Sequence, residues 1–264
     1  MVLKPPAAAR GLASVGLAAL VAGAGWQRGA LTIDGAVAAT AVGAATFGAG
    51  GLDVGLGLIV FFVTGSALSR RRPVPGEVTA SKGHRRDAAQ VLANGGVAAL
   101  AALLAAGGNG WARGAVVGSL AAAAADTWAS EIGVRSPTPP RSIVTGEVVL
   151  PGTSGGASSL GWTAAAAGAL AVGLTVCAVR RQRGAWGATL ARSLLGGLIG
   201  TLADSLAGAT IQAAYVCDLC GAPAETPGLH CGQPRRLVRG HAWVTNDVVN
   251  LIGTAAGGLA GALV

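Results

Sequence analysis

The chain has 264 residues, of which 52% are hydrophobic and only 11% are charged. Because a soluble domain carries about 25% charged residues, this composition excludes a soluble globular protein and predicts an integral membrane protein. The net charge of +8 comes with no recognisable nucleic-acid-binding module, so we attribute it to basic loops beside an anionic membrane leaflet and expect no nucleic-acid partner.

Small residues dominate the sequence: Gly accounts for 44 of the 264 residues, and aromatic residues for only 4%. Small side chains let helix backbones approach one another closely inside a membrane. The sequence therefore predicts an all-α fold, a polytopic transmembrane helical bundle packed through Gly and Ala. We expect residues 1–264 to form a single integral membrane domain.

Seven or eight stretches are apolar over about the 20 residues that a membrane-spanning helix needs. The clearest of them, 52–69, ends at three arginines and a proline. In chain order, the predicted spans are 11–26, 30–48, 52–69, 87–106, 112–132, 156–179, 187–214 and 244–264.

The long loops 70–86, 133–152 and 215–243 share one side of the membrane if each span crosses once. With the short connection at 27–29, that side carries 12 Lys and Arg residues and the other side carries six. The positive-inside rule then predicts that the long loops are cytoplasmic and that the protein lies in the inner, cytoplasmic membrane. The arginines within 180–183 argue for the opposite orientation, and a broken or re-entrant helix would remove that conflict.

The fifth predicted span ends in the acidic residues Asp126 and Glu131. An acid inside a membrane span costs roughly 2.5 to 3.5 kcal/mol on insertion scales and is a functional hypothesis by default; the alternative is a structural contact between helices. Carboxylates beside the hydroxyls of Thr127 and Ser130 suit Mg²⁺. The two acids lie about 140° apart on a helix, so they would meet one ion only if the helix loosened near Gly133.

A basic segment precedes the fourth predicted span. Lys82, Arg85 and Arg86 offer positive charge for phosphate oxygens. Arg86, Gln90 and Asn94 are four residues apart, so on a helix they form one polar stripe. The alternative is a stop-transfer cluster of charge, with Gln90 and Asn94 as polar contacts between helices.

A glycine-rich turn precedes the sixth predicted span. It consists of Gly152, Thr153, Ser154, Gly155 and Gly156. A turn of this kind at the start of a helix can point backbone N–H groups at an anion. The turn lacks a Walker motif, and a merely flexible connection is the alternative.

Two later spans also contain polar residues. Asp204 lies inside an apolar stretch beside Ser205, in a setting similar to that of Asp126, and the pair suggests shared metal ligation. Asp247 and Asn250 begin the last span, and the alternative is that Asn246 or Thr245 merely caps the helix there.

The loop 215–243 contains Cys217, Cys220, His230 and Cys231. Three cysteines and one histidine suit tetrahedral Zn²⁺, although adjacent His and Cys residues are not the usual ligand spacing. Reduced thiols without a metal are an alternative, as is a disulfide, which a cytoplasmic loop disfavours.

Six blocks of sequence occur in a characteristic order: KGHRRDAAQVLANG, ADTWASEIG, GTSGGAS, GTLADSLAGA, HCG and NDVVN, at 82–95, 125–133, 152–158, 200–209, 230–232 and 246–250. Their order resembles that of the transmembrane protein 19 family, which includes the plant phytyl-phosphate kinase, over roughly residues 30–264. Ser154 stands where the family pattern would have Asn. The resemblance implies a kinase that uses a nucleoside triphosphate, with CTP as the first choice, to convert an isoprenyl monophosphate into the diphosphate.

The residue patterns and the resemblance together assign roles to the polar residues. Asp126, Asp204 and Asp247, helped by Glu131 and Asn250, would bind Mg²⁺, while Lys82, Arg85 and Arg86 and the 152–156 turn would bind phosphate. The prenyl tail would lie between helices in the bilayer. Two alternatives stay open: a CTP-dependent cytidylyltransferase acting on a membrane lipid, and an ion-coupled transporter that uses Asp126 and Asp204.

Overall fold

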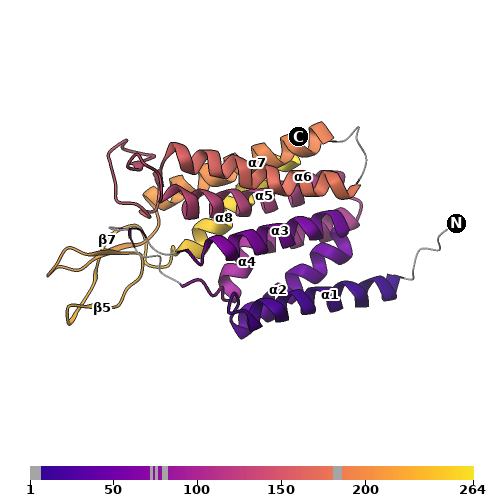
Figure 1. The fold of residues 1–264 in the computed structure, drawn as a ribbon, viewed down its shortest axis with the longest axis horizontal. Coiled ribbons are helices and arrows are strands. Elements are labelled where there is room, and N and C mark those ends of the chain that lie inside the picture. The colour runs from indigo at the N-terminus through magenta and orange to yellow at the C-terminus, as the bar shows by residue number, and fades with distance from the viewer. Residues whose placement is uncertain (1–6, 72–73, 75–76, 79–82, 181–185) are drawn as a thin grey trace.

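The computed structural model describes residues 7–71, 74, 77–78, 83–180 and 186–264, and over these residues it contains eight α-helices (Figure 1). The helices are α1 (Ala7–Gln27), α2 (Ile33–Ala45), α3 (Leu52–Leu68), α4 (Ala88–Ala106), α5 (Gly110–Gly133), α6 (Ser159–Arg180), α7 (Trp186–Thr210) and α8 (Asn246–Ala262). A single π-helical turn, Thr46–Gly50, extends α2. The predicted all-α bundle is confirmed.

Short strands occur only in the loops of the described chain. β1 (Arg141–Ser142) pairs with β2 (Gly156–Ala157), and β5 (Leu229–His230) pairs with β6 (Gln233–Pro234). A three-stranded sheet has the order β4-β3-β7, from Pro223–Ala224, Ala214–Val216 and Arg236–Arg239. The strands labelled in Figure 1, β5 and β7, lie at the end of the bundle where α5 and α7 finish and α6 and α8 begin. We call this the loop end.

Three stretches of the described chain are long and apolar enough to cross a membrane, namely Ile33–Gly50, Ala88–Ala106 and Ser159–Arg180. The apolar helices Gly11–Gln27 and Leu52–Leu68 are shorter. The helix α5 is less apolar because it contacts protein rather than lipid: it packs against α3, α4, α6, α7 and α8, and every residue from Gly114 to Ala125 is buried.

Glycines bring α5, α7 and α8 into backbone contact. A Cβ atom at Gly118 of α5 would lie 2.2 Å from the carbonyl oxygen of Gly257 in α8. A Cβ atom at Gly196 of α7 would lie 2.5 Å from the Cα atom of Gly118. Helices in a membrane associate through such close packing rather than through hydrophobicity. These three glycines therefore form a tightly closed seam in the middle of the bundle.

Replacing Gly118 with Val is expected to destabilise the protein by at least about 3 kcal/mol, because the side chain would overlap backbone atoms that cannot move aside. Thermal unfolding in detergent would measure the loss. Gly96→Ala in α4 is the matched control, because its Cβ atom would meet nothing within 4 Å. Equal melting temperatures for the two variants would contradict the packing described here.

The opposite end of the bundle holds an ion pair around a buried acid, Asp53. Asp53 Oδ2 accepts a hydrogen bond of 2.5 Å from Arg113 and lies 3.5 Å from Arg180 Nε. Both α6 and α7 are continuous over their described lengths, so neither shows the break that would remove the conflict in charge bias. Asp53 instead offsets part of the positive charge near the end of α6.

Candidate functional site at the loop end of the bundle

Two carboxyl groups meet between α5 and α7. The side chains of Asp126 and Asp204 lie within hydrogen-bonding reach of each other. Asp204 Oδ2 is buried, and among the described residues it has no hydrogen-bond partner. Gly253 of α8 closes the third side, where an added Cβ atom would lie 3.1 Å from the Cβ atom of Asp204. We call Asp126 and Asp204 the acid pair.

The first turns of α8 extend this polar region. Asp247, Asn250 and Gly253 are spaced by three residues, so they follow one face of α8, and Gly253 packs against Asp204. Thr245 is the N-cap residue of α8, but its side chain makes no capping hydrogen bond. Carboxylate and amide groups from three helices thus converge on the loop end.

In the described structure Glu131 is paired with Arg71, and its predicted role as a metal ligand stays a prediction. Its carboxylate accepts a 2.8 Å hydrogen bond from Arg71 Nε, and the same guanidinium group lies 2.6 Å from Glu77. The ion pair with Arg71 lowers the pKa of Glu77. The helix does not loosen before Gly133, so Glu131 stays on a different face from Asp126.

Arg86 lies between α3 and the last turns of α5. Its guanidinium group donates a 2.8 Å hydrogen bond to Ser66 and sits 5.8 and 5.9 Å from the ring centres of Phe61 and Phe62. A Cβ atom built on Gly65 would lie 2.9 Å from Arg86 and 3.2 Å from Thr127 of α5. Arg86 therefore carries a positive charge into the bundle.

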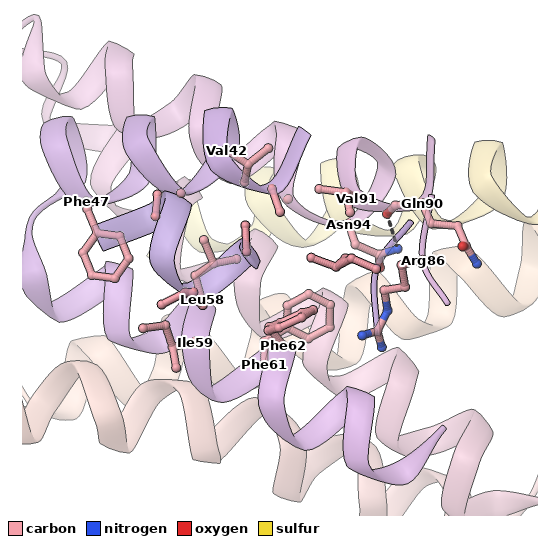
Figure 2. Close-up of a pocket in the computed structure, with 17 residues that line it drawn as sticks. Val42, Phe47, Leu58, Ile59, Phe61, Phe62, Arg86, Gln90, Val91 and Asn94 are labelled. Atoms are coloured by element: carbon pink, nitrogen blue, oxygen red, sulfur yellow. Dashed lines mark hydrogen bonds between the residues drawn. The ribbon is translucent and has the colours of Figure 1, made fainter. Parts of the chain in front are cut away.

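An apolar cavity begins at Arg86 and runs between α1, α2, α3 and α4 (Figure 2). It contains about 620 Å³ of space that no protein atom fills, part of it open to the surroundings. In Figure 2, Arg86, Gln90 and Asn94 lie together on one side of this space, and Phe47 and Ile59 lie on the other. The cavity thus has one polar end and a long apolar body.

The three polar lining residues are not equally available. Gln90 and Asp87 form a capping box at the start of α4, with hydrogen bonds of 2.9 and 3.1 Å. Asn94 donates to the carbonyl oxygen of Gln90 at 2.9 Å. These bonds shape the start of α4 and leave Arg86 as the charged group at the polar end.

Arg85 does not join Arg86 in the described structure. Arg85 is exposed, and its guanidinium group reaches the carbonyl oxygen of Leu31 at 3.4 Å. Lys82 lies outside the described residues. Of the three residues predicted to bind phosphate, Arg86 is the one that lines the cavity in the described structure.

The glycine-rich turn packs on the end of α7. Gly152 and Gly155 have positive φ angles of 80° and 79°. Gly155 lies so close to Ala209 that a Cβ atom would come within 2.4 Å of the Ala209 Cβ atom. The turn is predicted to lead directly into α6, but the short strand β2 and Ser158 lie between them. The Ser158 hydroxyl accepts a hydrogen bond from Gly161 N–H at 3.1 Å.

Glu225 is a site residue that the sequence analysis missed. Its carboxylate accepts a hydrogen bond from Ser154 Oγ in the glycine-rich turn. It is also near enough to Asp204 for the two charges to interact. Glu225 stands in an irregular Pro- and Ala-containing segment, and its only sequence signal is that no other acid lies between Cys220 and His230.

The structure brings Cys217, Cys220, His230 and Cys231 together. Their potential ligand atoms all lie within 4.8 Å of one another. A hydrogen bond with His230 lowers the pKa of the Cys217 thiol to about 6, and a hydrogen bond with Cys220 raises that of Cys231 to about 11. The thiols of this group therefore differ in acidity.

The fold and this polar end define a multi-helix integral membrane protein with a half-buried acid pair. The family model described as "Integral membrane protein DUF92" matches residues 16–258, and the chain belongs to that family. The earlier resemblance to the transmembrane protein 19 family falls within this group.

Two relatives illustrate how widely the sequence pattern occurs. Protein PGR of Arabidopsis thaliana is 32% identical over 240 residues, which cover 80% of this chain and 82% of the relative. Uncharacterized membrane protein MJ0933 of Methanocaldococcus jannaschii is 32% identical over 214 residues, covering 78% and 74% of the two chains. No solved structure matches the chain.

Proposed function

We propose that this protein is a lipid kinase that transfers the γ-phosphate of a nucleoside triphosphate, with CTP as the first choice, to an isoprenyl or phytyl monophosphate. One observation carries the proposal: a half-buried acid pair lies at the same end of the bundle as an arginine that closes an apolar cavity. Phosphoryl transfer needs positioned charge more than covalent chemistry from the protein, and this arrangement supplies charge of both signs.

The acid pair is suited to Mg²⁺. The carboxylates of Asp126 and Asp204 lie against each other, Asp204 Oδ2 is buried without a described partner, and Glu225 adds a third negative charge nearby. Oxygen donors of this kind are the ligands that Mg²⁺ prefers. We assign Asp126 and Asp204 to the metal, together with Asp247 and Asn250 from the first turns of α8; the metal when bound would neutralise charge on the transferred phosphoryl group.

The cavity suits the lipid acceptor. Its apolar body would hold the isoprenoid tail between α1, α2, α3 and α4, and Arg86 would bind the acceptor phosphate at the polar end. An oxygen of that phosphate attacks the γ-phosphorus, the bond from the γ-phosphorus to the β–γ bridging oxygen breaks, and the nucleoside diphosphate leaves. The attacking oxygen is already anionic, so the protein needs no dedicated base.

The glycine-rich turn suits the donor triphosphate. Two of its N–H groups are used internally, since Thr153 N–H donates to Leu150 and Gly156 N–H donates to Thr153. We therefore assign the N–H groups of Ser154 and Gly155 to phosphate oxygens. Their place on the end of α7, next to Glu225, sets the donor beside the acid pair.

The tight packing above the acid pair favours a one-sided site over a transport path. Between the acid pair and the opposite end of the bundle, Gly118, Gly196 and Gly257 press three backbones together. This seam leaves no room for a solute along α5, α7 and α8 in the described conformation. A bundle closed along this seam supports an enzyme rather than a transporter.

The direct test is an assay of the purified full-length protein with Mg²⁺, each labelled nucleoside triphosphate in turn, and geranylgeranyl or phytyl monophosphate. We expect a labelled lipid diphosphate and release of a nucleoside diphosphate. Release of pyrophosphate would indicate the cytidylyltransferase instead. If no donor yields a lipid diphosphate, the proposed kinase activity is wrong.

A further inference from the structure

Four soft ligands converge in the loop between β3 and β7. His230 Nδ1 lies 3.4 Å from Cys220 Sγ and 3.3 Å from Cys231 Sγ. Cys217 Sγ completes the group, whose ligand atoms all lie within 4.8 Å of one another. In a tetrahedral zinc site, bond lengths of about 2.3 Å to sulfur and 2.0 Å to nitrogen separate the ligand atoms by about 3.5 to 3.8 Å. The observed spacing is close to that requirement.

The backbone explains how adjacent residues can face the same point. Cys231 and Gly232 form the two-residue turn between β5 and β6, and both have positive φ angles, 51° and 77°. Cys231 is the one non-glycine residue with positive φ in the described chain. Asn or Gly usually occupies such a turn, so a strained cysteine there calls for a role of its own.

The other two cysteines form a second tight turn. Gly221, with φ of 71°, donates its N–H to the carbonyl oxygen of Cys217 at 2.8 Å, and Cys217 N–H donates to Ala222 at 3.0 Å. The Cys217 side chain is buried, whereas Cys220 and Cys231 are exposed. Two turns that each end in Cys–Gly therefore bring three sulfur atoms close to His230.

We propose that Cys217, Cys220, Cys231 and Nδ1 of His230 bind one structural zinc ion. Thiolate and imidazole ligands in a four-coordinate group favour zinc over Mg²⁺, Ca²⁺ or Mn²⁺. A single disulfide would leave one thiol unused and would not account for the placement of His230. The site is separate from the acid pair, because it lies in the hairpins beyond the helices.

The zinc ion would fix the position of Glu225. The segment between Cys220 and His230 carries Glu225, and both ends of that segment would be joined at the metal. Glu225 in turn holds Ser154 of the glycine-rich turn. Glu225 is thus a positioning residue: the metal would keep the loop against the turn, whatever reaction the acid pair supports.

Metal analysis of the purified full-length protein tests this inference. We expect about one zinc ion per chain, and a loss of at least nine tenths of it in Cys220→Ser and in Cys231→Ser. Cys177→Ser, which changes a cysteine buried in α6, is the matched control and should keep its zinc. Cobalt bound in place of zinc should give a thiolate-to-metal charge-transfer band that Cys220→Ser lacks.

A Cys220→His variant distinguishes loss of a ligand from a folding defect. Compared with Cys220→Ser it restores a metal ligand, so it should bind zinc again. Wild-type protein without metal, zinc retained in both Ser variants, or a disulfide found by mass spectrometry would each overturn the inference. Zinc content does not depend on kinase turnover, so failure of the proposed function would leave this result intact.

Discussion

Asp126→Asn is expected to reduce lipid diphosphate formation by at least about a thousandfold. A metal ion supplies several kcal/mol of transition-state stabilisation, and about 4 kcal/mol corresponds to a factor of 10³ in rate. Asn has nearly the same volume as Asp and can donate a hydrogen bond to Asp204, so the bundle should fold. Steady-state turnover with saturating Mg²⁺ measures the effect.

The control for this variant is Asp53, a buried acid in the same bundle. Asp53→Asn removes the partner of Arg113 and Arg180 at the opposite end. It should lower the melting temperature while turnover per folded molecule stays within about threefold, because Asp53 is remote from the acid pair. Normal turnover of Asp126→Asn, or an equal loss in Asp53→Asn, would remove the acid pair from the proposed site.

Arg86→Gln is expected to raise the KM for the lipid monophosphate by about 10- to 150-fold. A hydrogen bond to a charged group contributes about 1.5 to 3 kcal/mol, which converts to that range of affinity. Arg86→Lys should recover part of the loss, because it keeps the charge but not the forked geometry of the guanidinium group. The KM for the nucleotide should change less.

The exposed neighbour Arg85 provides the control, since Arg85→Gln removes the same charge outside the cavity. We expect Arg85→Gln to change the KM for the lipid by less than about threefold, the range that surface charges usually produce. A purely structural Arg86, holding Ser66 and packing on Phe61, would lower stability and leave KM unchanged. Equal effects of the two substitutions would likewise contradict a phosphate site at Arg86.

The helices could be predicted from sequence because apolar runs and their boundaries are local features. The predicted span 52–69 ends at a charge cluster, and α3 covers Leu52–Leu68. The strands could not be predicted in the same way. Each has two to four residues, too few to display the alternation by which a strand is recognised.

The polar site was only partly accessible from the sequence. Helix geometry alone predicted that Asp126 and Glu131 occupy different faces, yet it could not reveal that Arg71, 60 residues away, holds Glu131. The position of Glu225 is set by an irregular loop, and no periodic sequence pattern predicts the path of such a loop. By spacing alone, the adjacent residues His230 and Cys231 are a poor pair of ligands for one metal ion. The left-handed conformation of Cys231, which lets both face one point, cannot be inferred from residue order.

The burial of α5 has a consequence for membrane insertion. A helix composed mainly of Ala and Gly and carrying Asp126 gains little from contact with lipid tails. Its stable place depends on α6, α7 and α8, which are synthesised later and pack against it. The two carboxyl groups can therefore meet only after α7 has entered the bilayer, so insertion of the C-terminal helices and assembly of the acid pair are one event.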